Sequence, residues 1–161
     1  MRVELIYWDA NAFLGLLQEE PEHVDLCRAT FDRAESGEVL IVTSTLTMAE
    51  VLWLRGKVPV PKDRAEIVKR FFRRSTIRLR NVTRQVAESA QELVWDYGIK
   101  PKDAVHVATA LEAGVSVLET FDKQLIGKSE SVGKPPLLIR RPLPPKQGSL
   151  DLVHKTQNPS S

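Results

Sequence analysis

Four carboxylates stand beside predicted strand ends or helix starts, and together they could support metal-assisted chemistry. They are Asp9 in IYWDAN, Glu50 in TMAEV, Asp103 in KPKDAVHVATA and Asp122 in ETFDKQL. Crowded carboxylates repel one another unless a cation lies between them, and hard oxygen ligands suit Mg²⁺ or Mn²⁺. The set therefore predicts a divalent metal site that acts on a phosphate ester.

The chain around these acids alternates short apolar runs with amphipathic stretches. Buried strands are predicted at 3–8, 39–44, 115–120 and 136–140, and a strand with one wet face, nearer a sheet edge, at 76–82. Helices are predicted at 12–18, 21–36, from Ser44 to near Gly56, and at 62–73, 84–97 and 102–113. This alternation predicts an α/β protein, with a central, mainly parallel sheet of about five strands between two helical layers.

The direction of these elements brings the acids to one edge of the sheet. Asp9 follows the first strand, and Glu50 lies about two turns into the helix that leaves the second. The helix at 102–113 runs directly into a strand, so it begins at the carboxyl edge with Asp103, and Asp122 follows that strand. Ligands of open parallel sheets bind at this edge.

Each acid taken singly also has a structural interpretation that competes evenly with metal binding. Asp9 could form a turn as the chain leaves its strand, and Glu50 could belong to a capping box. Asp103 could favour the positive end of its helix, and Asp122 could be an N-cap. Four such roles coinciding on one rim are less expected than a common site, so the site is favoured.

Composition limits the alternatives. A chain of 161 residues is long enough for one domain with a core, which we place at 1–141, followed by a Pro-rich, polar and flexible tail at 142–161. One cysteine excludes an internal disulfide, and no targeting or membrane-length apolar run stands out, so we expect a cytoplasmic protein. No P-loop, GxGxxG, GxSxG or CxxC motif is present, which disfavours nucleotide-cofactor, serine-hydrolase and thiol-redox classes.

Four motifs over about residues 3–140 resemble the PIN domain, the nuclease module of VapC toxins in bacterial and archaeal toxin–antitoxin pairs. They are D-x-N at Asp9 and Asn11, S-x₅-E from Ser44, DAVHVATAL from Asp103, and T-x-D-x-x-L from Thr120. The first is weak alone, whereas the last two in succession are fairly specific.

The resemblance implies a PIN-like fold and an endoribonuclease whose Mg²⁺ or Mn²⁺ is held by the four acids. A bound water would attack phosphorus in line and leave 5′-phosphate and 3′-hydroxyl ends. Asn11, Ser44 and Thr120 would be supporting polar residues. Lys123 stands where some relatives have another acid, which leaves the number of metal ions open.

The resemblance also implies an RNA substrate, a cognate antitoxin and a homodimer, with no membrane partner. The apolar residues of the first helix could serve the dimer, although core packing is their default role; they are Phe13, Leu14, Leu16 and Leu17. Which RNA is cut stays open.

Two further features have open interpretations. Five arginines form a stripe that could bind RNA phosphates or be a solvated basic face, with equal weight: Arg70, Arg73 and Arg74, at i, i+3 and i+4, and Arg78 and Arg80, on one face of the next strand. His106, one turn after Asp103, is better explained as a packed, hydrogen-bonded histidine than as a catalytic one.

Two rival functions remain. One is a catalytically silent PIN-like scaffold that binds RNA or a partner, which intact acids at all four positions disfavour. The other is a haloacid-dehalogenase-like phosphatase, which needs a second Asp where this chain has Asn11.

Overall fold

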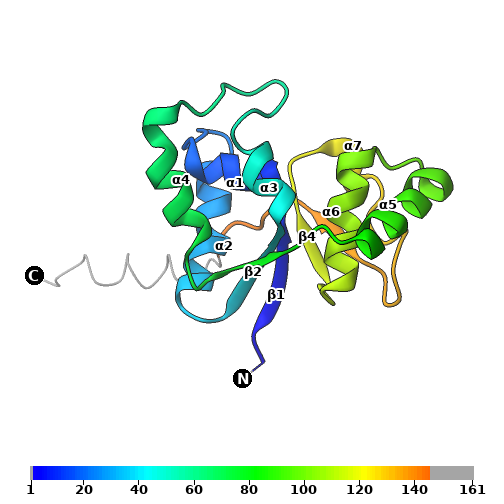
Figure 1. The fold of residues 1–161 in the computed structure, drawn as a ribbon. Helices are drawn as coiled ribbons and strands as arrows, with labels where there is room; N and C mark the ends of the chain where they lie inside the picture. The colour runs from blue at the N-terminus through cyan, green and yellow to red at the C-terminus, as the bar shows by residue number, and fades with distance from the viewer. Residues whose placement is uncertain (1, 146–161) are drawn as a thin grey trace, which may run out of the picture.

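A computed structural model describes residues 2–145. Within these residues, five strands form one sheet, and every pair of neighbouring strands is parallel (Figure 1). The strands, in the order β3-β2-β1-β4-β5 across the sheet, are β1 (Glu4–Trp8), β2 (Val39–Ser44), β3 (Ile77–Arg80), β4 (Val117–Glu119) and β5 (Leu138–Arg140). The predicted parallel sheet is confirmed, and β3 lies at its edge as expected.

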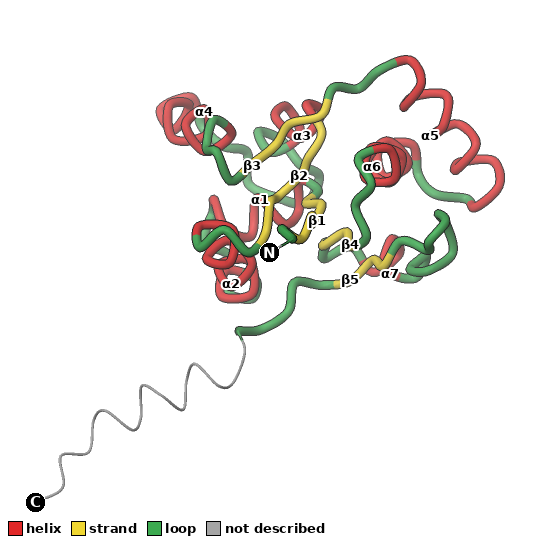
Figure 2. The backbone as a smooth tube through the Cα atoms, turned by 90° about the horizontal axis from the view of Figure 1, so that it is seen from below, coloured by secondary structure: helices red, strands yellow, loops and turns green. Residues whose placement is uncertain are grey.

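Helices cover both faces of this sheet. They are α1 (Ala10–Leu17), α2 (Val24–Glu35), α3 (Thr45–Glu50), the short 3₁₀ turn η1 (Lys62–Arg64), α4 (Ala65–Phe72), α5 (Arg84–Tyr97), α6 (Pro101–Glu112) and α7 (Lys123–Ile126). Figure 2 shows α1, α2 and α4 on one face and α5 and α6 on the other. The three-layer α/β/α arrangement predicted from the sequence is therefore confirmed.

Side chains of β1 alternate between two hydrophobic cores, as strand geometry requires. Ile6 and Trp8 pack with Phe13 in the core under α1, α2 and α4. Tyr7 packs in the second core, under α5 and α6. Phe13 and Leu14 are fully buried in this fold, so core packing accounts for these two members of the predicted dimer surface.

Two predicted helices differ from the structure in length. The helix expected to reach Gly56 ends at Glu50, because the N–H groups of Leu52 and Trp53 bond the carbonyls three residues back and tighten the chain into turns. The helix expected from residue 21 begins at Val24, after a turn in which the carbonyl of Glu20 accepts from His23 and Val24.

Two expectations concern the chain ends and membranes. Of the predicted tail at 142–161, residues 146–161 lie outside the described part of the chain. Within residues 2–145, no helix combines the length and the apolar character that crossing a bilayer requires.

Candidate active site

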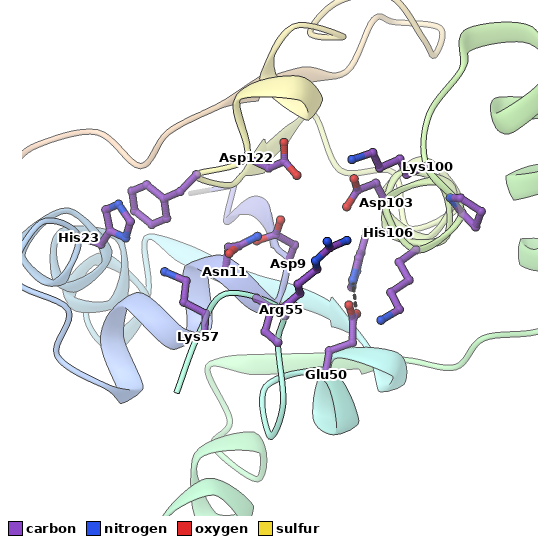
Figure 3. Close-up of a pocket in the computed structure, with 15 residues that line it drawn as sticks. Asp9, Asn11, His23, Glu50, Arg55, Lys57, Lys100, Asp103, His106 and Asp122 are labelled. Carbon is purple, nitrogen blue, oxygen red and sulfur yellow. Dashed lines mark hydrogen bonds and ion pairs between the residues drawn. The ribbon is translucent and has the colours of Figure 1, made fainter. Parts of the chain in front are cut away.

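The four acids line one pocket of about 650 Å³ at the carboxyl edge of the sheet, where β1 lies between β2 and β4 (Figure 3). Asp9 follows β1, and Glu50 is the last residue of α3. Asp103 lies in the first turn of α6, and Asp122 follows β4. Asn11 also lines the pocket, half-buried. The structure thus brings together acids that are more than a hundred residues apart in sequence.

Helix capping orients two of these carboxylates. Asp9 caps α1, since its Oδ1 accepts from the N–H of Ala12 at 3.1 Å. Asp122 caps α7, since its Oδ1 accepts from the N–H groups of Gln124 at 2.9 Å and Leu125 at 3.2 Å. The cap leaves Oδ2 of Asp122 without a hydrogen bond in the described residues, whereas Oδ2 of Asp9 accepts from Thr120. Each carboxylate oxygen has two lone pairs, so one hydrogen bond does not prevent it from binding a ligand. The structural and the site interpretations of these two acids are therefore compatible.

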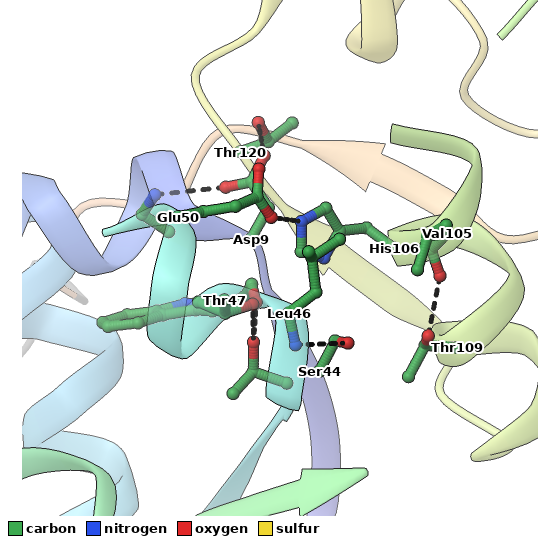
Figure 4. Close-up of polar contacts among 12 residues, drawn as sticks. Asp9, Ser44, Leu46, Thr47, Glu50, Val105, His106, Thr109 and Thr120 are labelled. Atoms are coloured by element: carbon green, nitrogen blue, oxygen red, sulfur yellow. Dashed lines mark hydrogen bonds and ion pairs between the residues drawn. The ribbon is translucent and has the colours of Figure 1, made fainter. Parts of the chain in front are cut away.

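Thr120 links Asp9 to Asp122 through its hydroxyl group. The Oγ1 of Thr120 donates to Oδ2 of Asp9 at 2.5 Å (Figure 4). The same oxygen accepts from the backbone N–H of Asp122 at 3.2 Å. Thr120 is completely buried and Asp9 nearly so. This buried link holds the chain after β4 against the chain after β1.

Glu50 is held by a buried histidine. The Nε2 of His106 lies 2.6 Å from Oε1 of Glu50, and its Nδ1 lies 2.6 Å from the hydroxyl of Tyr7. A carboxylate oxygen accepts hydrogen bonds, so Nε2 of His106 carries the hydrogen and donates the hydrogen bond to Oε1 of Glu50. Burial raises the pKa of Tyr7, which keeps its hydroxyl protonated. His106 is 2% exposed, which agrees with the packed, hydrogen-bonded role predicted for it.

Burial and mutual repulsion perturb the acids of the pocket. Burial, then the charges of Asp122 and Asp9, raises the pKa of Asp103 to about 6. Burial also raises the pKa of Asp9, while His106 and the hydroxyl of Thr120 act in the opposite direction. A bound cation would relieve this repulsion directly.

The donor set fits a hard divalent cation without forming a closed cage. In the described residues, no three His, Cys, Asp or Glu side chains converge closely enough to enclose a metal as they stand. Mg²⁺ does not need such a cage, because it keeps several waters and binds through one or two carboxylates plus substrate phosphates. An open pocket lined by four carboxylates is suited to that mode.

The remaining predicted residues lie away from the pocket lining. Ser44 caps α3, where its Oγ accepts from the N–H of Leu46. Arg70 and Arg73 are exposed, at the end of α4 and just after it. Arg74 pairs with Glu35 at 3.1 Å and lies over the rings of Phe31 and Phe71. RNA binding by these arginines stays a prediction.

Sequence reasoning missed several residues of the pocket. It did not identify Tyr7 as the partner of His106, nor the cations of the lining, which are Arg55, Lys57, Lys100 and Lys102. The K-P-K-D run at 100–103 was the available signal, since it places two lysines beside a candidate metal ligand at a helix start.

Comparisons with known proteins agree with this fold. A model of the PIN domain family matches residues 6–129. The toxin VapC20 of Mycobacterium tuberculosis, described as cleaving the sarcin-ricin loop, is 17% identical, with a TM-score of 0.55 over 74% of this chain and 92% of its own. A DNA-bound VapBC from Salmonella typhimurium is 18% identical, with a TM-score of 0.59 over 87% and 98%.

A toxin–antitoxin complex from Klebsiella pneumoniae is 22% identical, with a TM-score of 0.53 over 74% of this chain and 88% of its own. Identities this low show a shared fold alone. No curated protein matches the chain in a sequence search.

Proposed function

The chain belongs to the PIN domain family, and from that premise we propose that it is a metal-dependent endoribonuclease acting as the toxin of a type II toxin–antitoxin pair. The observation that carries this proposal is the convergence of Asp9, Glu50, Asp103 and Asp122 in one open pocket. Structural neighbours include a toxin–antitoxin complex and a toxin described as cleaving the sarcin-ricin loop, which supports the same class.

The four acids are the proposed ligands of Mg²⁺ or Mn²⁺. Such an ion supplies a water of lowered pKa for attack on phosphorus and stabilises charge on the phosphate. Thr120 keeps one oxygen of Asp9 directed by donating to it, and His106 does the same for Glu50. Asp103 has no capping contact of its own, and a cation beside it would favour the charged form that burial and the neighbouring acids disfavour.

Direct hydrolysis by water needs no attack by the neighbouring 2′-oxygen of the RNA. The proposed products therefore carry 5′-phosphate and 3′-hydroxyl ends. Asn11, half-buried in the pocket lining, is proposed to orient a carboxylate or a phosphate oxygen.

The toxin proposal includes a protein partner. A neighbouring fold is found in a complex described as toxin–antitoxin, so we propose a cognate antitoxin for this chain. We also propose a homodimer of the chain, which rests on its membership of the PIN domain family alone. Co-expression with a candidate antitoxin should suppress nuclease activity, and the mass of the free protein in solution should be twice that of the 18.1 kDa chain.

Cleavage of a mixed RNA pool tests the proposal. Wild type, Asp9→Asn and the control Asp96→Asn are compared in Mg²⁺, Mn²⁺ or EDTA, and the new RNA ends are sequenced. Asp96 is a suitable control because it is exposed on α5 and does not line the pocket. We expect metal-dependent cutting by wild type and control, loss of cutting in Asp9→Asn, and 5′-phosphate products. Cutting that persists in EDTA or in Asp9→Asn would overturn the metal mechanism.

A silent RNA-binding scaffold is the second candidate, and one observation favours it. Oε1 of Glu50 already has a hydrogen-bond partner in His106, so Glu50 depends less on a cation than a carboxylate without any partner would. A scaffold should bind RNA equally well with and without Asp9, and should leave the whole pool intact at saturating Mn²⁺.

A further inference from the structure

The acidic pocket carries cations at its edge that the chain itself does not neutralise. Arg55 comes from the loop between α3 and η1, whereas Lys100 and Lys102 flank the start of α6. Figure 3 shows Arg55 and Lys100 reaching the pocket from these two segments, with Lys100 directed toward Asp103 and Asp122. We call these three cations the basic rim.

The three charges of the basic rim are available to bind an anionic ligand. All three side chains are exposed, and none lies within ion-pair distance of a carboxylate in residues 2–145. Lys57, the fourth cation of the lining, differs because its Nζ already pairs with Glu20 at 2.5 Å. Cations kept beside acids without pairing to them are suited to an anion that bridges the pocket.

An exposed indole stands beside the rim in sequence. Trp53 is 79% exposed, and the two residues that follow it, Leu54 and Arg55, line the pocket. A large apolar ring left in water two residues before a cation of the rim is suited to binding single-stranded nucleic acid, where cations follow the backbone and aromatic rings stack on bases.

We propose that the basic rim and Trp53 bind single-stranded RNA across the acidic pocket, with the rim contacting phosphates on both sides of the bond to be cut. This rests on the proposed nuclease function and adds to it the residues that position the substrate. A pocket of about 650 Å³ takes a ligand of drug size, such as one phosphodiester with its neighbouring sugar and base.

Binding of a fluorescein-labelled, mixed-sequence single-stranded RNA of about 12 nucleotides, measured by anisotropy in EDTA, tests this separately from cleavage. Each phosphate contact contributes about 0.7 to the slope of log affinity against log salt for a single strand, so removing three should flatten it by about 2. Raising the salt from 50 to 200 mM weakens the binding of both proteins. The loss of affinity of wild type should exceed that of Arg55→Gln/Lys100→Gln/Lys102→Gln by a factor of about 20.

Three comparisons make the test specific. Arg2→Gln/Arg84→Gln/Lys134→Gln removes the same charge from exposed positions outside the pocket lining and should keep the wild-type slope. Arg70→Gln/Arg73→Gln/Arg74→Gln tests the arginines that the sequence singled out. If that variant flattens the slope and the rim variant does not, RNA binds along α4 and the inference is overturned.

Trp53→Ala tests the stacking surface, with Trp95→Ala as its control. Trp95 is similarly exposed, at 70%, on α5. Loss of one stacked base weakens binding by about fivefold or more, so Trp53→Ala should weaken binding without changing the salt slope, and Trp95→Ala should change neither. Equal effects of both variants, or preference of wild type for a duplex RNA probe, would contradict the proposed site.

The outcomes also separate this inference from the nuclease proposal. Cleavage by wild type, together with an unchanged slope in the rim variant, removes the inference and leaves the nuclease. A flattened slope without any cleavage by wild type removes the nuclease and leaves an RNA-binding site.

Discussion

Replacing Asp103 by Asn should stabilise the metal-free protein while it abolishes metal-dependent cleavage. Burial, followed by the charges of Asp122 and Asp9, raises the pKa of Asp103 from 3.8 to about 6. An acid whose pKa is higher in the folded state binds more protons there, so the free energy of unfolding falls as the pH rises from about 4 to about 6. Asn cannot ionise, so the variant escapes that loss.

The expected gain can be worked from the same environment. A difference of about 2 in pKa corresponds to about 3 kcal/mol, because each tenfold change in proton affinity is worth about 1.4 kcal/mol. Asp103 is only half-buried, so solvent screening reduces this figure. A charged carboxylate in the first turn of α6 is also favoured by about 0.3–1 kcal/mol, which the variant gives up. We therefore expect a net gain of about 1 kcal/mol near pH 7.5, and less near pH 5.

Thermal unfolding in EDTA measures this gain. A stabilisation of about 1 kcal/mol should raise the Tm by about 2–4 °C for a domain of this size. Adding Mg²⁺ should raise the Tm of wild type by mass action and should affect Asp103→Asn much less. A variant that is no more stable than wild type near pH 7.5, or whose gain is equal at both pH values, would refute the combined effect of burial and repulsion on Asp103.

Three other substitutions have defined outcomes. Thr120→Val removes the donor to Asp9 and should lower kcat by about 10- to 100-fold while Thr120→Ser retains activity; equal kcat values would contradict the orienting role. His106→Phe leaves Tyr7 and Glu50 without their buried partner and should cost about 2–3 kcal/mol in urea unfolding; a negligible loss would show that water replaces the ring. Gly15→Ala places a Cβ 2.8 Å from Sγ of Cys27 and should cost about 1–3 kcal/mol. Adding Cys27→Ala should recover part of that loss, and full additivity in urea unfolding would contradict the clash.

The edge on which the site lies was predictable because it depends on local signals. Pro101 and Gly114 mark the ends of one helix, and the direction of that helix into the next strand puts Asp103 at the carboxyl edge. The structural roles weighed for Asp9 and Asp122 are also present, since both acids cap helices. A cap contact uses one lone pair of one oxygen, so it orients the carboxylate and still allows it to bind a ligand.

What the sequence could not provide were contacts between distant segments. Glu50 and His106 are 56 residues apart, and no local pattern pairs them. The position of Arg55 was hidden because the apolar spacing from Met48 to Leu54 favoured a continuous helix, whereas the chain turns after Glu50 and carries Arg55 to the pocket. A periodic pattern reports which residues are apolar and does not report where burial stops.

Location of Mn²⁺ in crystals by anomalous diffraction tests the central claim most directly. We expect a peak in the pocket within about 2.0–2.3 Å of carboxylate oxygens from at least two of the four acids, Asp9, Glu50, Asp103 and Asp122, completed by waters. The peak should be absent in crystals of Asp103→Asn grown under the same conditions. A peak elsewhere on the molecule, or an empty pocket in wild type at saturating Mn²⁺, would contradict the metal site and the nuclease mechanism built on it.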